Sequence, residues 1–315
     1  MNLQDLPVLP PQSLPECIRS TLCFFDLFDY PLTFDELRYY LLCTKHYSDE
    51  EIFEALKKCS SVVFRDGFYC LVGSEGHVNS RKVRAVIAGE YNKKLRRFLP
   101  FIRLVPFVKM VAVCNTLAIG CPTAKSDIDL FIISKKDRIF IVRTLTAILF
   151  HILGVRRHGE KVAGRFCLSF FISEEKMNLQ DLLKGKDDIY FMYWFRTLRP
   201  LYGLEVFQKL LQSNEWAKTY FAQSLEDNRK QDIRFSQRAG VFRFFAFLWE
   251  FLLGGFLGKM LENALSRSHM KRHVKRSASL QGESSVVVSS GMLKYHNVDR
   301  REEYRLRFFD KFLKS

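Results

Sequence analysis

Two acidic residues near the middle of the chain have a spacing that suits metal chemistry. Asp127 and Asp129 stand two positions apart in a stretch that is otherwise mostly apolar and β-branched. Side chains two residues apart project from the same face of a strand, so the pattern predicts two adjacent carboxylates. Like charges held this close repel each other unless a cation neutralises them. Mg²⁺ or Mn²⁺, which prefer oxygen ligands, would meet that need; the alternative is a solvated pair without a ligand.

A turn upstream of the pair contains residues that can hold phosphate. We expect strands at residues 108–114 and 128–133, with Thr116 and Gly120 in the turn that follows the first of them. A hydroxyl group and free backbone N–H groups in such a turn can bind phosphate oxygens. The sequence therefore places a candidate phosphate site beside a candidate metal site.

The spacing across this whole segment resembles that of the polymerase-beta-like nucleotidyltransferase superfamily. The matching residues are Asn115-Thr116, Gly120 and Ser126-Asp127-Ile128-Asp129, without a gap. The resemblance implies a mixed α/β sheet core and a reaction in which a hydroxyl group attacks the α-phosphate of a nucleoside triphosphate and pyrophosphate leaves. It also implies that Asp127 and Asp129 are catalytic and bind the metal. The residues that it implies for nucleotide or phosphate binding are Asn115, Thr116, Gly120 and Ser126.

The chain departs from the family pattern at two places. Asn115 stands where the family has glycine, and Asn tolerates a left-handed backbone better than most residues but less well than Gly. The family also has a third carboxylate on a later strand. The matching strand here, residues 166–172, contains Cys167 and Ser169 and no acid. Glu174, just past that strand, is the candidate third acid, and its neighbour Glu175 is the alternative.

Basic residues near the pair could extend the phosphate site. Arg157 and Lys161 follow a helix expected at residues 138–153, where they would bind triphosphate or, alternatively, form a solvated turn at the end of the helix. A basic helix expected at residues 81–98 could follow a nucleic-acid backbone or be a solvated face.

The charge of the chain is divided unevenly. Residues 1–79 carry a net charge of −6 and residues 80–315 carry +21, within a total of +15. A basic body attracts polyanions, so RNA is a candidate partner. The eight cysteines form no CxxC motif, which predicts free thiols in a reducing compartment and a cytoplasmic location. The acidic, proline-rich start does not resemble a secretory signal.

The order of predicted elements indicates an α+β protein with three segments. Residues 1–78 resemble a winged helix, with helices at 18–28, 34–42 and 49–59 and a hairpin that turns at Asp66-Gly67. Residues 79–203 form the nucleotidyltransferase-like core. Residues 204–315 form a mainly helical basic region with a flexible segment at 266–290. The third N-terminal helix is acidic, which argues against duplex DNA and for packing on the core or on a protein partner.

One apolar run lies in the last segment. Residues 244–258 are apolar except for Glu250 and Gly residues, and they fall short of the about 20 apolar residues that a membrane-spanning helix needs. The run predicts a buried helix and no transmembrane segment, with attachment to a membrane surface as the alternative.

These features predict a Mg²⁺-dependent nucleotidyltransferase that transfers a nucleoside monophosphate to a hydroxyl acceptor. Two alternatives remain open. One is a non-catalytic module that binds nucleotide or nucleic acid, and the other is a winged-helix regulator whose body senses a ligand. Fold resemblance alone does not decide among them.

Overall fold

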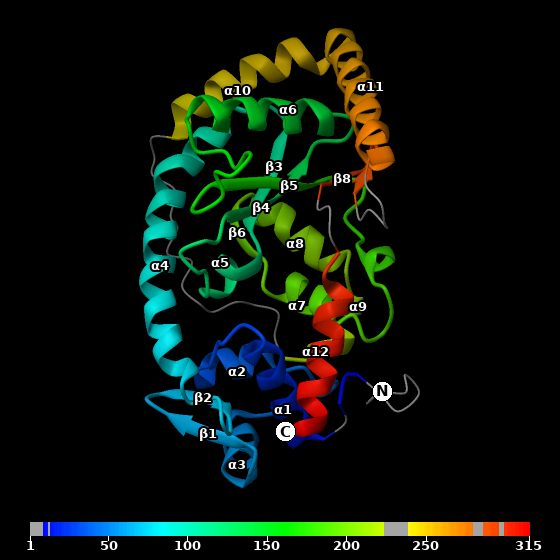
Figure 1. Cartoon of the computed structure of the whole chain (residues 1–315). Coiled ribbons are helices and arrows are strands. Elements are labelled where there is room, and N and C mark those ends of the chain that lie inside the picture. The colour runs from blue at the N-terminus through cyan, green and yellow to red at the C-terminus, as the bar shows by residue number, and fades with distance from the viewer. Residues whose placement is uncertain (1–8, 12, 224–238, 280–285, 296–298) are drawn as a thin grey trace.

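The computed structural model describes residues 9–11, 13–223, 239–279, 286–295 and 299–315 (Figure 1). Within these residues the chain has an α+β fold around a mixed six-stranded sheet, as predicted. The N-terminal helices lie at one end of the molecule, and α10 (Ala239–Gly254) and α11 (Phe256–Ser279) lie at the other.

The first segment has the predicted order of three helices and a hairpin. These elements are α1 (Leu14–Asp26), α2 (Phe34–Tyr40), α3 (Asp49–Lys58), β1 (Val62–Arg65) and β2 (Phe68–Leu71). Helices α2 and α3 both begin with capping boxes, formed by Thr33 with Glu36 and by Ser48 with Glu51. Asp66 and Gly67 both have positive φ, which is typical of the tight turn in a two-residue hairpin.

The six-stranded sheet has the order β6-β3-β4-β5-β8-β7. Its strands are β3 (Val108–Val113), β4 (Ile128–Ser134), β5 (Phe166–Ser173), β6 (Arg199–Tyr202), β7 (Val287–Val288) and β8 (Met292–Lys294). Strands β4 and β5 are parallel and all other neighbours are antiparallel. Because β4 lies between β3 and β5, its backbone is hydrogen-bonded along both edges.

Helices cover both faces of the sheet. On one face an apolar core joins the sheet to α4 (His77–Phe98), the short helix Leu99–Leu104 and α6 (Ile139–Ile152), and α10 and α11 pack outside these. On the other face a second core joins the sheet to α7 (Ile189–Arg196), α8 (Leu204–Gln212) and α9 (Trp216–Tyr220).

The first segment shares its core with the rest of the chain. Phe24 and Phe25 of α1 contact Tyr193 of α7, and Phe308 and Phe309 of α12 (Arg301–Lys314) belong to the same cluster. This packing places the first segment against α7 and α12, one of the two placements that the sequence favoured.

Ion pairs join the acidic first segment to the basic helix α4. Arg81 pairs with Glu36 at 2.9 Å, and its guanidinium lies over the rings of Tyr30 and Phe68. Arg84 pairs with Asp29 at 2.7 Å, and Lys82 pairs with Asp66 at 2.8 Å. Three basic residues at the start of α4 therefore pair with carboxylates of the first segment.

The predicted set of strands, residues 108–114, 128–133 and 166–172, was incomplete. Helix α7 ends at Arg196 and β6 follows, because residues 199–202 pair with β3. The last segment also contributes β7 and β8, which the sequence did not indicate.

The flexible segment predicted from residue 266 was also wrong over residues 266–279, which continue α11. Its Lys, Arg and Met residues are good helix formers, and the imidazole of His269 bonds to Thr144 and Tyr295. Residues 280–285 lie outside the described part of the chain.

The apolar run at residues 244–258 is not buried as predicted. Phe251 is 80% exposed and Phe256 is 75% exposed. Among the described residues no single helix is long and apolar enough to cross a membrane. One bent pair, Phe242–Gly254 with Phe256–Arg272 at 87°, meets the length and composition required when its two helices are taken together.

Loss of the Arg81 side chain should destabilise the fold much more than loss of its neighbour Lys82. Arg81→Ala leaves the partly buried Glu36 without its cation, and we expect a loss of about 2–4 kcal/mol in unfolding free energy by urea denaturation. The matched control, Lys82→Ala, breaks an exposed pair and should cost less than about 1 kcal/mol. Equal losses would show that the junction does not depend on the buried pair.

Candidate functional site

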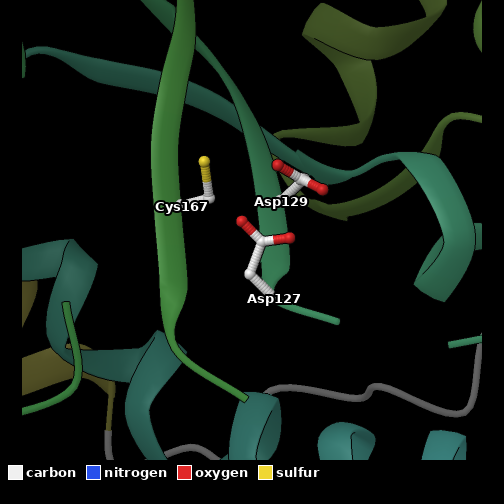
Figure 2. Close-up of side chains that lie close together, drawn as sticks. All are labelled: Asp127, Asp129 and Cys167. Atoms are coloured by element: carbon white, nitrogen blue, oxygen red, sulfur yellow. The ribbon is translucent and has the colours of Figure 1, made fainter. Parts of the chain in front are cut away.

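Asp129 of the predicted acidic pair is the second residue of the central strand β4, and Asp127 lies immediately before that strand (Figure 2). The Cys114 N–H donates to the Asp129 carbonyl at 3.1 Å, and the Ile128 N–H donates to the Arg165 carbonyl at 2.8 Å, so both neighbouring segments fix the backbone here. Cys167 of β5 lies opposite Asp129 in the parallel pairing. One side-chain ligand atom from each of Asp127, Asp129 and Cys167 lies within 4.8 Å of the other two.

The environment disfavours a negative charge on Asp129. Burial, followed by the charge of Asp127, raises the pKa of Asp129 to about 6, and a hydrogen bond from Asn115 opposes this shift. Burial and the two aspartates also raise the pKa of the Cys167 thiol, so it stays protonated at neutral pH. A cation at this place would therefore relieve a repulsion that the fold has built in.

Arg157 already supplies part of that positive charge. Its Nη1 atom lies 2.6 Å from Oδ2 of Asp127 and 3.6 Å from the Cys167 sulfur. The guanidinium comes from the loop between α6 and β5, which Lys94 of α4 fixes by donating to the Gly164 carbonyl at 2.6 Å. The structure thus brings the predicted Arg157 to the acidic pair.

The predicted phosphate turn includes a short helix, α5 (Asn115–Ile119), that follows β3. Asn115 has φ of 57°, and Gly120 ends the helix with φ of 82°. Both residues thus have a left-handed backbone, which Asn and Gly tolerate better than most other residues do. A Cβ atom at Gly120 would also lie 3.3 Å from the Tyr30 hydroxyl. The turn is therefore shaped by residue types that allow this backbone.

A cavity of about 220 Å³ adjoins the acidic pair. Its polar wall consists of Asn115, Thr116, Ser126, Asp127 and Asp129. Its aromatic wall comes from α1 and the turn that follows it, from α7 and from α12, and consists of Phe24, Phe28, Tyr190, Tyr193, Trp194 and Tyr304. Tyr304 stacks on Tyr190 at a centroid distance of 4.8 Å and on Phe28 at 5.2 Å.

Sequence reasoning missed the aromatic wall. The run Tyr190–Phe195 is rich in aromatic residues, but only the fold tells which of them face the acidic pair. Tyr304 lies far along the chain from Asp127, and nothing in its local sequence relates the two. The wall depends on the packing of α1 and α12 on α7, which is a long-range property.

Other predicted site residues lie elsewhere or have other partners. The Ser126 hydroxyl borders the cavity but bonds to the N–H and hydroxyl of Thr123. Lys161 lies in the loop after α6, where its backbone pairs with that of His158, and it does not line the cavity.

Glu174 does not reach the acidic pair, so its assignment as a third acid was wrong. Its carboxylate accepts from the Lys136 N–H at 3.0 Å, and its own N–H donates to the Ser134 carbonyl. It therefore lies at the opposite end of β4 from Asp129, roughly 17 Å away along the strand. Glu175 pairs with Lys136 at 2.6 Å at that same end.

Comparisons with protein-family models, with curated proteins and with solved structures find no match to this chain.

Replacement of Asp129 by Asn should stabilise the metal-free protein at neutral pH. The raised pKa means that the folded protein holds this proton more tightly than the unfolded chain, so folding stability decreases as pH rises through about 6. Asn cannot ionise and keeps the shape. We expect Asp129→Asn to gain about 1–3 kcal/mol above pH 7 and little near pH 4, measured by denaturation in the presence of a chelator.

The matched control is Asp181→Asn, which removes an exposed carboxylate that pairs with Lys176. It should change stability by less than about 1 kcal/mol at either pH. A gain for Asp129→Asn that is independent of pH would contradict the electrostatic explanation.

Proposed function

We propose that this chain is a metal-dependent nucleotidyltransferase in which one acidic position of the site has become Cys167. The observation that carries the proposal is the pair Asp127 and Asp129, side by side at the start of a central strand and open to a cavity with polar and aromatic walls. The resemblance of the sequence across 115–129 points to the same chemistry. We also propose that the first segment is a winged helix.

The donor set fits Mg²⁺ or Mn²⁺ in part. Two carboxylates suit a hard cation, and the raised pKa of Asp129 marks a repulsion that a cation would remove. Cys167 offers a thiol where a carboxylate would complete the set, and thiols favour softer ions. A bound divalent ion would neutralise phosphate charge and favour loss of the proton from the attacking hydroxyl. Asp127 and Asp129 would hold that ion.

The other residues of the site would bind and orient the nucleotide. The Thr116 hydroxyl and Asn115 border the cavity next to the carboxylates, where phosphate oxygens would lie. Arg157, now paired with Asp127, would turn its remaining N–H groups toward the triphosphate. Phe28, Tyr190 and Tyr304 line the cavity, where a base would stack on an aromatic ring, and such stacking accepts any base.

We infer the partners of the protein from the distribution of charge on its surface. The start of α4 is engaged by the first segment, so RNA or another polyanionic acceptor would contact cations elsewhere, such as Arg96 and Arg97 at the end of α4. The exposed acidic side of α3, which includes Glu50 and Glu54 beside Phe53, favours a protein partner over DNA. Free buried cysteines fit a cytoplasmic location.

A second candidate function is nucleotide binding without turnover. The observation that favours it is Cys167, because a protonated thiol can neither hold Mg²⁺ well nor accept a proton from the acceptor hydroxyl. If the chain is a nucleotidyltransferase, a carboxylate in place of Cys167 should increase turnover. If it only binds nucleotide, the same change should leave turnover absent.

The test is Cys167→Asp, because Cys167 and not Ser169 lies opposite Asp129 in the pairing of β4 with β5. We expect wild-type transfer to be slow, and Cys167→Asp to raise it by roughly tenfold or more, which is the lower range for a positioned acid or base. The measurement is Mg²⁺-dependent incorporation of labelled nucleotide into a panel of RNA, protein and small-molecule acceptors.

Two matched variants control this test. Ser169→Asp places the same charge two residues further along β5, on the same face of the strand, and should raise transfer less. Asp127→Asn combined with Cys167→Asp should abolish transfer. Nucleotide binding without transfer in every variant would favour the non-catalytic candidate, and transfer that survives loss of Asp127 and Asp129 would exclude the proposed site.

A further inference from the structure

Helix α10 is apolar around most of its circumference, with Arg243 and Glu250 as its two charged residues, yet it rests on the protein through one narrow stripe. The residues turned toward the protein are Phe242, Ala246, Glu250 and Leu253. The other faces of α10 and the first turns of α11 expose large apolar side chains, which are Phe244, Phe245, Phe247, Leu248, Trp249, Phe251, Leu252, Phe256, Leu257, Met260 and Leu261. We call these residues the α10–α11 apolar face.

This face is far larger than the exposed apolar patches that a monomeric protein usually carries. Its side chains are between 38% and 80% exposed, and six of them are aromatic. With about 150–250 Å² for each large aromatic side chain, the exposed apolar area is on the order of 1,000 Å². The largest such patch on an ordinary monomer is about 300–600 Å², and patches beyond that size mark interaction sites.

Both carboxylates of this region point away from the apolar face and into the protein. Glu250 accepts from the Phe107 N–H at 2.7 Å. Glu262 accepts from the N–H groups of Phe140 and Ile141, both at 2.9 Å, and so caps the start of α6. Arg138 donates to the carbonyls of Leu253 and Gly254 and fixes the bend. The two helices are thus anchored by inward polar contacts, which leave the face free of negative charge.

Among the described side chains of α10 and α11, the charged groups that reach the solvent are positive. Arg243 and Lys259 lie within it and are exposed, and Arg267, Lys271 and Arg272 follow along the exposed side of α11. Cations beside exposed aromatic and aliphatic side chains are typical of helices that lie in the interface of an anionic membrane.

We propose that the α10–α11 apolar face binds the surface of a bilayer that contains anionic phospholipid. Helix α10 would lie in the plane of the membrane, with its aromatic side chains among the acyl chains and its cations at the headgroups. The 87° bend prevents the pair from acting as one straight span. The cavity beside Asp127 is lined by α7, which packs on one face of the sheet, whereas α10 and α11 pack outside α6 and the Leu99–Leu104 helix on the other face. Docking through α10 and α11 would therefore leave the cavity accessible.

Charge favours lipid over a second copy of the chain. A symmetric dimer would bring the same face of two copies together, and with it the cations Arg243 and Lys259 of both. Like charges that meet across an interface oppose association, and this face carries no carboxylate to pair with them. An anionic headgroup layer supplies the missing charge.

The test uses the full chain with phosphatidylcholine vesicles, with and without phosphatidylglycerol, in flotation. We expect the protein to float with the anionic vesicles and to bind less at high salt, and the fluorescence of Trp249, which is 52% exposed, to shift to shorter wavelength. Phe247→Ser with Phe251→Ser should lower the vesicle partition coefficient roughly tenfold or more, because two deeply inserted rings are lost.

The matched control is Phe53→Ser with Phe64→Ser, which removes two exposed rings from the first segment at the other end of the molecule. It should bind vesicles as the wild type does. The proposal is overturned by equal binding of all variants, by the absence of vesicle binding in the wild type, or by a lipid-free dimer that is lost in Phe247→Ser with Phe251→Ser. Light scattering of the lipid-free protein reports the last outcome.

Discussion

The repulsion between two carboxylates on one strand is the constraint around which the rest of the site is arranged. Asp127 and Asp129 share a face because side chains alternate along an extended backbone, and the pairing of β4 with β3 and β5 holds that backbone in place. The guanidinium of Arg157 and the hydrogen bond from Asn115 offset only part of this repulsion. Carboxylates that repel each other in such a place cost stability, and the cation that we propose for this site would remove that cost.

The position of the first segment follows from a second electrostatic feature. Its negative charge meets the positive start of α4, and Arg81 lies between Glu36 and the rings of Tyr30 and Phe68. This junction, together with the shared apolar core, places α1 against α7. Phe28 thereby becomes part of the cavity wall. The acidic segment therefore contributes to the shape of the site, although none of its carboxylates is part of the acidic pair.

Much of the local structure could be predicted because local signals agree with the fold. The capping residues Thr33 and Ser48, the Asp66-Gly67 turn and the apolar strands β3, β4 and β5 all lie where short-range patterns put them. The acidic pair could be found for the same reason, since its spacing is a property of one strand.

The features that could not be predicted depend on contacts between distant segments. Strand β6 exists because it pairs with β3, and the wall residue Tyr304 depends on the packing of α12. Glu174 was proposed as an acid because it follows β5 closely in sequence, but the strand carries it away from Asp129. The exposure of α10 reversed the usual expectation that an apolar helix is buried.

Titration with Mn²⁺ by calorimetry tests the central claim most directly. The account predicts that the wild-type protein binds Mn²⁺ and releases protons near pH 6, and that Asp127→Asn with Asp129→Asn abolishes binding while the circular dichroism spectrum and thermal unfolding remain those of a folded protein. Equal Mn²⁺ affinity in the wild type and in the folded double variant would contradict it, because the cation would then bind somewhere other than this carboxylate pair.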